Sequence, residues 1–148
     1  LQRVKEQNKD NSVFYVQYAH ARICSMLNKI REEFPTMKLD DLNLRKGQLN
    51  LLKERHEIDI IKELSGWPNV VENAALSGEP HRIAFYLEEL ASNFHVVWNV
   101  GNNNQDFRFV IPGNIELTRA RAALGRAVAI VLASGLSVIG IKAVEEMR

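Results

Sequence analysis

The stretch from Ser12 to Arg31 constrains the fold most strongly, because its spacing predicts one long helix with two different faces. At about 100° per residue, its apolar side chains gather into one stripe of the kind that packs against a helical core. The members of this apolar stripe are Val16, Ala19, Ile23, Met26, Leu27 and Ile30. Aromatic rings and cations share a second stripe, within about 60° of each other. The members of the second stripe are Tyr15, Tyr18, Arg22 and Lys29.

The second stripe has two interpretations. Tyrosines beside a core face usually pack at its edge, and arginine and lysine are common on helix surfaces. Alternatively, rings beside cations suit an unpaired nucleobase and its phosphates. The geometry of the stripe alone favours the first interpretation.

Length and composition bound the class of protein. A chain of 148 residues with 46% hydrophobic content is the size of one domain and can bury a core. Its net charge of +1 is far below the basic excess that broad phosphate binding requires, so any contact with nucleic acid must be local. Because the first residue is Leu1 rather than methionine, we interpret the chain as a piece of a longer protein, with removal of a leader or a tag as the alternative.

Cysteine use and hydropathy indicate the compartment. Cys24 is the only cysteine, which excludes a disulfide framework and a cysteine-based metal site, and a small buried residue in a reducing cytosol is the favoured interpretation. No stretch approaches the roughly 20 apolar residues of a membrane span, and the polar residues 1–11 are unlike a signal peptide. We therefore expect a cytoplasmic protein without a membrane partner.

Periodicity and helix-end signals predict the other helices. Apolar residues recur at helical spacing from Gln48 to Leu64, and Gly66 follows as a stop signal. A short helix over Asn69 to Leu76 and a long one over Pro80 to Val100 each begin near a proline. The final helix, Ile115 to Leu136, is rich in alanine, so we expect it to be the central packing helix.

The remaining segments are predicted to be caps, turns and loops. Ser12 should cap the first helix, which should end near Pro35. Residues 36–46 follow as a connecting loop that can include a short turn, and Gly101 should end the second long helix. Phe107 to Ile111 has no second strand to pair with, so we expect an extended loop that packs on the helices.

These elements predict an all-α fold, an irregular helical bundle of about five helices, with one last turn at residues 143–147. Arg119 and Arg126 lie seven residues apart on the final helix. They fit either a solvated helix surface or a phosphate clamp, and the surface is the favoured interpretation.

The sequence contains no catalytic constellation. It has no glycine-rich phosphate loop of a common spacing, no nucleophile elbow, and no metal-ligand spacing among its histidines. The histidines are His20, His56, His81 and His95. Each of them has a helix-surface or core-edge explanation. We therefore expect this chain to catalyse nothing alone and to bind no metal.

Three blocks of sequence carry a resemblance that covers nearly the whole chain. They read KDNSVFYVQYAHARICS near the start, EPHRIAFYLEELASNFHVVWN in the middle, and IELTRARAALGRAVAIVLASGLSVIGIKAVEEM at the end. In order and spacing they resemble the C-terminal anticodon-binding domain (DALR type) of bacterial arginyl-tRNA synthetases, an all-helical domain of class I aminoacyl-tRNA synthetases. The resemblance implies that residues 1–11 connect to a catalytic domain and that residues 12–148 form the anticodon-binding bundle.

The resemblance also implies site residues. In the family, the tyrosines and the arginine of the first helix line the anticodon pocket, an aromatic pair one turn apart on a later helix supplies a stacking surface, and a methionine at the C-terminus approaches the anticodon loop. The matching residues here are Tyr15, Tyr18, Arg22, Phe94, Trp98 and Met147. From geometry alone, Phe94 and Trp98 fit a core better than a ligand site.

The chain departs from the family pattern in three places. Ser12 stands where relatives commonly have proline, and Phe94 where some have tyrosine, which removes a hydroxyl but keeps a ring. Relatives usually end in Arg-Met, whereas here Glu146 precedes Met147 and Arg148 follows it. The last departure bears on the role of the C-terminus in the pocket.

The function implied by the resemblance is recognition of arginine tRNA by its anticodon loop. The intact enzyme would join arginine to that tRNA with ATP and Mg²⁺, while this chain itself would carry no cofactor and act as part of a monomer. Its partners would be the tRNA and the catalytic domain of the same protein. The alternative is a protein-interaction bundle without RNA binding, in which Tyr15, Tyr18, Phe94 and Trp98 form an aromatic anchor.

Overall fold

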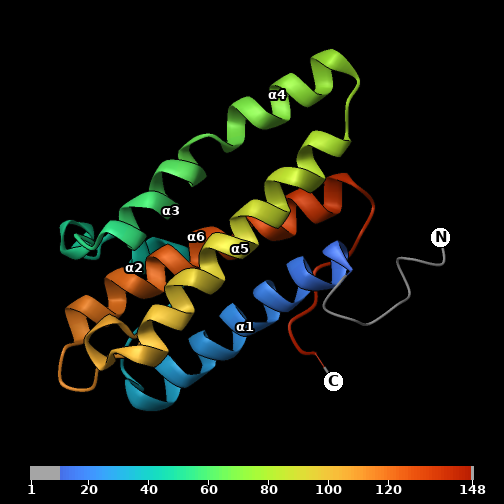
Figure 1. Cartoon of the computed structure of the whole chain (residues 1–148). Coiled ribbons are helices and arrows are strands. Elements are labelled where there is room, and N and C mark those ends of the chain that lie inside the picture. Colours follow the sequence, from blue (N-terminus) through green and yellow to red (C-terminus); the bar gives the residue numbers. More distant parts are fainter. Residues whose placement is uncertain (1–10, 148) are drawn as a thin grey trace.

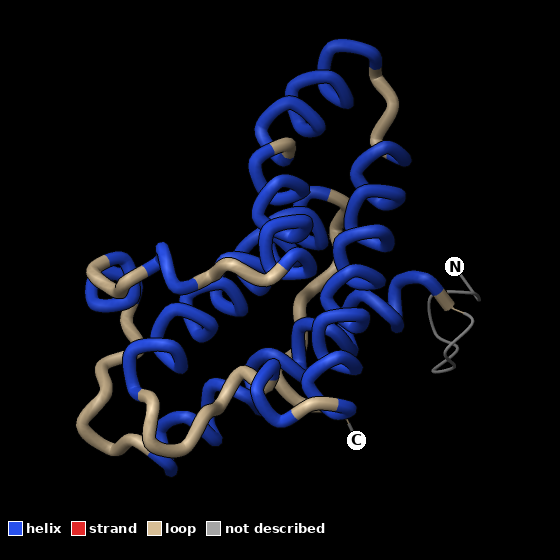
Figure 2. Tube along the Cα trace, turned by 60° about the vertical axis from the view of Figure 1, so that its left-hand side comes forward, coloured by secondary structure: helices blue, strands red, loops and turns tan. Residues whose placement is uncertain are grey.

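The computed structural model describes residues 11–147, and that part of the chain is helical, without strands (Figures 1 and 2). The α-helices are α1 (Ser12–Glu33), α2 (Asp41–Arg45), α3 (Arg55–Ser65), α4 (Trp67–Ser77), α5 (His81–Asn103) and α6 (Ile115–Val138). Two 3₁₀ turns accompany them, η2 (Leu49–Leu51) and η3 (Gln105–Phe107). The all-α prediction is confirmed. Apart from Asn11, the predicted connecting segment lies outside the described residues.

The three long helices α1, α5 and α6 pack against one another and enclose the core (Figure 1). Each contributes fully buried side chains, such as Ile23, Phe94 and Leu132. Small residues of α6 let its neighbours approach closely. At Gly125 an added Cβ would lie 2.5 Å from the Cε of Met26 on α1. The prediction that the final helix is the central packing helix is consistent with these contacts.

The shorter helices α3 and α4 run almost end to end beside α5 (Figure 1). Gly66 ends α3 and precedes α4, which has a proline in its first turn. The Tyr86 hydroxyl of α5 donates to the carbonyl of Glu63 at 2.7 Å, and its ring stacks on Trp67 with centroids 5.3 Å apart. These contacts attach the α3–α4 layer to the three-helix core.

One predicted helix cap and one predicted helix start are wrong. Asn11, not Ser12, caps α1, because its Oδ1 accepts from the amide of Val13 at 3.1 Å. The helix predicted from Gln48 begins only at Arg55. There Glu54 and Glu57 form a reciprocal capping box, which fixes the true start.

Three further boundaries differ from the predictions. The loop predicted at residues 36–46 contains the short helix α2. Helix α5 continues through Gly101 to Asn103, because this buried glycine serves a close approach: an added Cβ would lie 3.0 Å from the carbonyl oxygen of Phe107. Residues 143–147 form no helical turn and run back along α1. The loop after Phe107 does pack as predicted, with Phe109 only 6% exposed.

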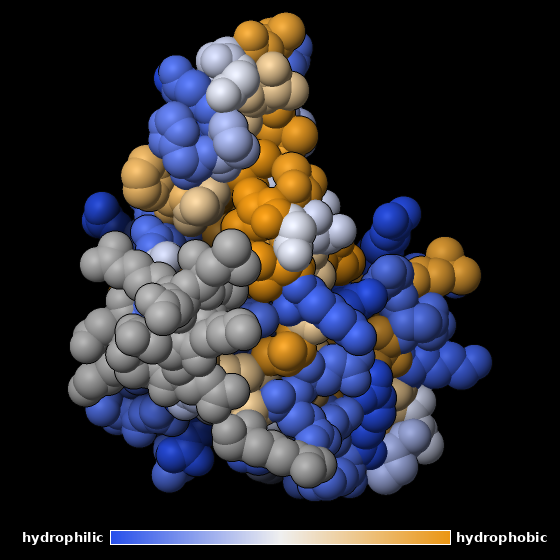
Figure 3. Space-filling model, turned by 90° about the vertical axis from the view of Figure 1, so that its right-hand side faces the viewer, coloured by the Kyte–Doolittle hydropathy of each residue, from blue (hydrophilic) through white to orange (hydrophobic). Residues whose placement is uncertain are grey.

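Helix α6 corrects the expectation that no stretch of the chain is long and apolar enough for a membrane span. It is 24 residues long and apolar enough to cross a membrane by length and composition. Half of its apolar stretch is buried within the bundle, and the core helix of a soluble protein passes the same test of length and composition. On the face seen in Figure 3, an orange hydrophobic area runs through the upper half, and the described residues at the lower right are mostly hydrophilic.

Candidate nucleic-acid interface

Helices α1 and α5 bring the predicted aromatic and cationic residues together. The guanidinium carbon of Arg22 lies 4.6 Å from the ring centroid of Tyr18 and 5.0 Å from that of Trp98. Both distances are within the range of a cation–π interaction. Tyr18 remains 36% exposed and Trp98 is half-buried, so this arrangement opens to solvent.

Arg22 is held at both ends of its guanidinium fork. One terminal nitrogen, Nη2, donates to the hydroxyl of Tyr18, and the other, Nη1, lies 3.0 Å from Nδ1 of His95. Because arginine only donates, Nδ1 of His95 must accept, which places the ring proton of a neutral histidine on Nε2. Burial, and then the positive charge of Arg22, lower the pKa of His95 to about 4, so the ring is neutral near pH 7.

His95 also supports the two tyrosines. Its ring centroid is 4.8 Å from that of Tyr15, at a tilt of 43°, and 5.5 Å from that of Tyr18, nearly parallel at 24°. The sequence analysis did not select His95 as a site residue. Its position three residues before Trp98 on the same helix was the available signal, because that spacing puts both side chains on neighbouring parts of one face.

Phe94 does not present a stacking surface in this structure. Its side chain is fully buried at 0% exposure, with ring centroids 6.2 Å from Trp98 and 5.8 Å from Phe109. A ring without an open face cannot stack on a nucleobase. Phe94 therefore packs in the core against Trp98, and its burial does not fit the expectation that its ring offers a stacking face, whereas the stacking role of Trp98 stays a prediction.

A recess of about 210 Å³, here called the small recess, opens beside Arg22. Its lining residues are Tyr18, Ala21, Arg22, Ser25, Met26, Lys29, Trp98 and Met147. Four of the six predicted site residues therefore line one cavity. Tyr15 lies behind it, against His95, and Phe94 lies beneath it.

The C-terminal segment delivers Met147 to the small recess. This segment lies against α1, where the Nε2 of Gln17 donates to the carbonyl of Lys142 at 3.0 Å. One turn further along α1, Nδ1 of His20 lies 2.7 Å from the carbonyl oxygen of Val144, and the imidazole must be the donor to that oxygen. The two hydrogen bonds direct the last residues along α1 toward Arg22.

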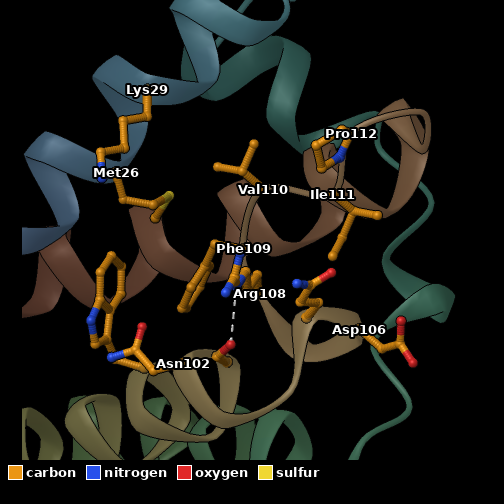
Figure 4. Close-up of a pocket in the computed structure, with 12 residues that line it drawn as sticks. Met26, Lys29, Asn102, Asp106, Arg108, Phe109, Val110, Ile111 and Pro112 are labelled. Carbon is orange, nitrogen blue, oxygen red and sulfur yellow. Dashed lines mark hydrogen bonds between the residues drawn. The ribbon is translucent and has the colours of Figure 1, made fainter.

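A second recess of about 570 Å³, here called the large recess, lies on the other side of Trp98 (Figure 4). It is enclosed by α1, the end of α5, η3 and the loop before α6. Its lining residues are Met26, Lys29, Trp98, Gly101, Asn102, Gln105, Asp106, Arg108, Phe109, Val110, Ile111 and Pro112. Met26, Lys29 and Trp98 belong to both recesses, so they form the wall between them.

A buried ion pair fixes the loop that lines the large recess. Arg121 of α6 donates from Nε to Oε2 of Glu57 at 2.9 Å, and these residues are 4% and 1% exposed. Its Nη1 donates to the carbonyls of Asp106 and Arg108, each at 2.7 Å. Arg121 therefore joins α3, α6 and this loop, a role that the sequence analysis did not assign.

Arg119 and Arg126 have protein partners instead. Nη1 of Arg119 lies 3.0 Å from Oε1 of Glu116, and Nε of Arg126 lies 3.0 Å from Oδ1 of Asp41. Neither arginine lines the small or the large recess. These contacts agree with the favoured interpretation of a helix surface.

The titratable groups of residues 11–147 include no group of three or more His, Cys, Asp and Glu side chains that could hold a metal ion. Cys24 is half-buried, and burial raises the pKa of its thiol.

The arrangement of Tyr18, Arg22 and Trp98 is suited to binding a flat, partly anionic ligand through aromatic rings and fixed hydrogen-bond donors.

Comparison with known proteins agrees with this geometry. Residues 16–147 match the family described as the DALR anticodon binding domain. The chain is 48% identical over 147 residues to the arginine-tRNA ligase of Rickettsia bellii (strain OSU 85-389) and 50% identical over 147 residues to that of Rickettsia felis. Each alignment covers 99% of this chain but 25% of the relative, so the chain spans about a quarter of the length of these curated relatives.

A solved structure has the same fold. A crystal structure described as an arginyl-tRNA synthetase of Campylobacter jejuni superposes with a TM-score of 0.75 at 25% sequence identity, over 99% of this chain and 29% of that one. The family match includes both recesses and every predicted site residue except Tyr15. This chain belongs to the family of DALR anticodon-binding domains, the C-terminal domains of arginyl-tRNA synthetases.

Proposed function

We propose that this domain binds the anticodon loop of an arginine tRNA and reads one unpaired base in the small recess. The observation that carries the proposal is the guanidinium of Arg22, held by Tyr18 and His95 beside the ring of Trp98. Membership of an anticodon-binding family supports RNA as the ligand.

The small recess offers both stacking and directional hydrogen bonds. Tyr18 presents an exposed ring, and the thioether of Met147 supplies a soft, adaptable contact. Both terminal nitrogens of Arg22 already donate one hydrogen bond to a protein partner, which leaves the second N–H of each and that of Nε for a base edge or a phosphate. A stacked base contributes about 1–3 kcal/mol of binding free energy.

Preorganised donors also give selectivity. A base that offers acceptors to Arg22 satisfies the fixed guanidinium, whereas one that presents donors leaves a partly buried charge unpaired. Because the net charge is only +1, recognition rests on this local arrangement rather than on a broad basic surface. We expect the central cytosine of the anticodon to be the base that is read.

The intact protein would be an arginine-tRNA ligase. Its ATP and Mg²⁺ would act in a catalytic domain outside this chain, and the whole would work as a cytoplasmic monomer. This chain would contribute tRNA recognition and no chemistry. The curated relatives, of which the chain covers 25%, support this division of labour.

The rival function is a protein-interaction bundle that uses the same aromatic residues as an anchor. The two functions differ in their dependence on salt, because RNA binding weakens steeply with ionic strength and an aromatic protein contact does not. The burial of Phe94 favours RNA, since it reduces the apolar anchor to the half-buried Trp98 and Tyr15 and the exposed Tyr18.

The test is a titration of this chain with an arginine-tRNA anticodon stem-loop, followed by tryptophan fluorescence at two salt concentrations. Trp67→Phe removes the only other tryptophan, so that Trp98 reports alone. We expect quenching that weakens with salt and that is lost when the central cytosine is changed.

Two variants separate charge from geometry. Arg22→Lys keeps the cation but loses the fork, and Tyr18→Phe keeps the ring but loses the hydroxyl that holds Arg22. Arg22→Lys should abolish discrimination between the two stem-loops, whereas Tyr18→Phe should only weaken it. Equal binding of both stem-loops by the unmodified chain would contradict base reading in the small recess.

A further inference from the structure

The large recess has no role in the function proposed above, although it adjoins the small recess. Its volume of about 570 Å³ falls within the range of small-ligand sites. The wall between the recesses consists of Met26, Lys29 and Trp98. A ligand that continues past Trp98 from the small recess would therefore enter the large one.

The polar groups of the large recess are chemically suited to a nucleotide. The side-chain amides of Asn102 and Gln105 and the ammonium of Lys29 are exposed to solvent, and among the described residues they have no hydrogen-bond partner within the protein. Arg108 donates only from Nε, to the carbonyl of Gly101 at 3.3 Å, which leaves both Nη groups available (Figure 4). Amides recognise base edges, and cations recognise phosphates.

The charges are distributed along the recess. In Figure 4, Lys29 descends from α1 on one side and Asp106 lies on the opposite side, so the recess has a cationic and an acidic end. Lys29 belongs to the shared wall, which places a cation between the two cavities. The apolar floor between the ends is formed by Phe109, which is 6% exposed, and by Val110.

We propose that the large recess binds the nucleotide adjacent in the RNA strand to the base read in the small recess. Lys29 contacts the phosphate that links the two nucleotides, while the amides of Asn102 and Gln105 bind the edge of the second base. This inference rests on the proposed function, because it requires an RNA strand that passes over Trp98. It adds a second base-binding site with its own residues.

The ion pair of Arg121 makes this site rigid. Its hydrogen bonds of 2.7 Å to the carbonyls of Asp106 and Arg108 hold the backbone on either side of Phe107. The backbone that carries the lining residues of this loop is therefore held in place before a ligand binds. A fixed loop reduces the ordering cost of binding.

The experiment compares stem-loops that carry one abasic nucleotide, on either the 5′ or the 3′ side of the central anticodon base. Removal of the base that occupies the large recess should weaken binding about 5- to 150-fold, and removal on the other side should have a smaller effect. The double variant Asn102→Ala/Gln105→Ala should lose affinity for the intact stem-loop but bind that abasic RNA as well as the unmodified chain does. Asn103→Ala, which changes a neighbouring exposed residue outside the recess, is the matched control.

A salt titration tests the phosphate contact. Lys29→Gln should reduce the slope of log affinity against log salt by about 0.7, the value for one phosphate of a single strand. Lys53→Gln, an exposed lysine outside both recesses, should leave the slope unchanged. Circular dichroism and thermal unfolding establish that each variant is folded.

The outcomes distinguish the two proposals. If the double variant still discriminates the central cytosine but the abasic effects are the same in both proteins, the large recess is not a base site and the small recess remains one. If the unmodified chain binds no stem-loop, both proposals are overturned. Equal weakening of intact and abasic RNA by the double variant would also overturn the second site.

Discussion

Nη1 of Arg22 on α1 lies 3.0 Å from Nδ1 of His95 on α5, and this contact sets the tautomer of one residue and the orientation of the other. Nε2 of the same imidazole is buried without a partner in the described part of the chain. A buried unpaired donor is costly. The hydrogen bond that Nδ1 accepts from Arg22 offsets this cost.

The first prediction follows from this acceptor role. In His95→Asn, the amide oxygen replaces Nδ1, whereas His95→Leu keeps the bulk and removes the acceptor. We expect His95→Leu to weaken stem-loop binding about tenfold, since a hydrogen bond to a charged group contributes about 1.5–3 kcal/mol, and His95→Asn to stay close to the unmodified affinity. Fluorescence titration measures both. Equal losses in the two variants would show that the ring matters only for packing.

The pH dependence of stability provides the second prediction. The pKa of His95 falls from 6.5 to about 4 on folding, so between these values the unfolded chain binds more protons than the folded one. Stability is therefore complete above pH 6.5 and is lost as the pH falls toward 4, by an amount on the order of 3 kcal/mol. Urea unfolding at pH 7, 5 and 4 should show a smaller loss in His95→Asn. Parallel curves for the two proteins would contradict the assignment.

The third prediction concerns the buried ion pair. Arg121→Met leaves the carboxylate of Glu57 buried at 1% exposure without its partner, and should reduce the free energy of unfolding by about 3–5 kcal/mol. The double variant Arg121→Met/Glu57→Leu should recover most of this loss. Arg126→Met is the control, because its exposed pair with Asp41 contributes no more than about 1 kcal/mol. Urea titration distinguishes the three proteins.

Two glycines of α6 offer a matched comparison. The Cβ of Gly125→Ala would lie 2.5 Å from the terminal methyl of Met26, a flexible group that lines both recesses. The Cβ of Gly135→Ala would lie within 3.0 Å of three side-chain atoms of Leu87, deep in the core. We expect Gly135→Ala to cost about 1–3 kcal/mol of stability and to leave RNA affinity unchanged. Gly125→Ala should weaken RNA binding and leave the stability almost unchanged. Thermal unfolding measures the stability of both variants, and fluorescence titration measures their affinity for RNA.

The long helices could be predicted from sequence because their apolar residues repeat with the helical period over many turns. The same rule failed at Leu51 and Leu52, which have helical spacing but lie in and just after a 3₁₀ turn. Leu52 is 8% exposed, so its burial is achieved by tertiary packing rather than by a helix face. A short apolar run therefore does not distinguish the buried face of a helix from a turn that tertiary packing buries.

The candidate site was predictable only in part. The stripe on α1 follows from local spacing, but the partner of Arg22 lies 73 residues away and that of Arg121 lies 64 residues away. Nothing local identifies such pairs. Arg121 nevertheless carried a signal, because it lies four residues after Leu117 and three before Leu124, on the apolar face of its helix. A cation in that position requires a buried partner.

The route of the C-terminal segment along α1 has a consequence for biosynthesis. The small recess combines residues from the first helix with Met147, so it is complete only after nearly all of the domain has been translated. A polypeptide that stops a few residues early would keep the hydrophobic core, whose helices end at Val138, but would lack one wall of the cavity. We therefore expect truncation before Met147 to leave the three long helices packed and to open the small recess on one side.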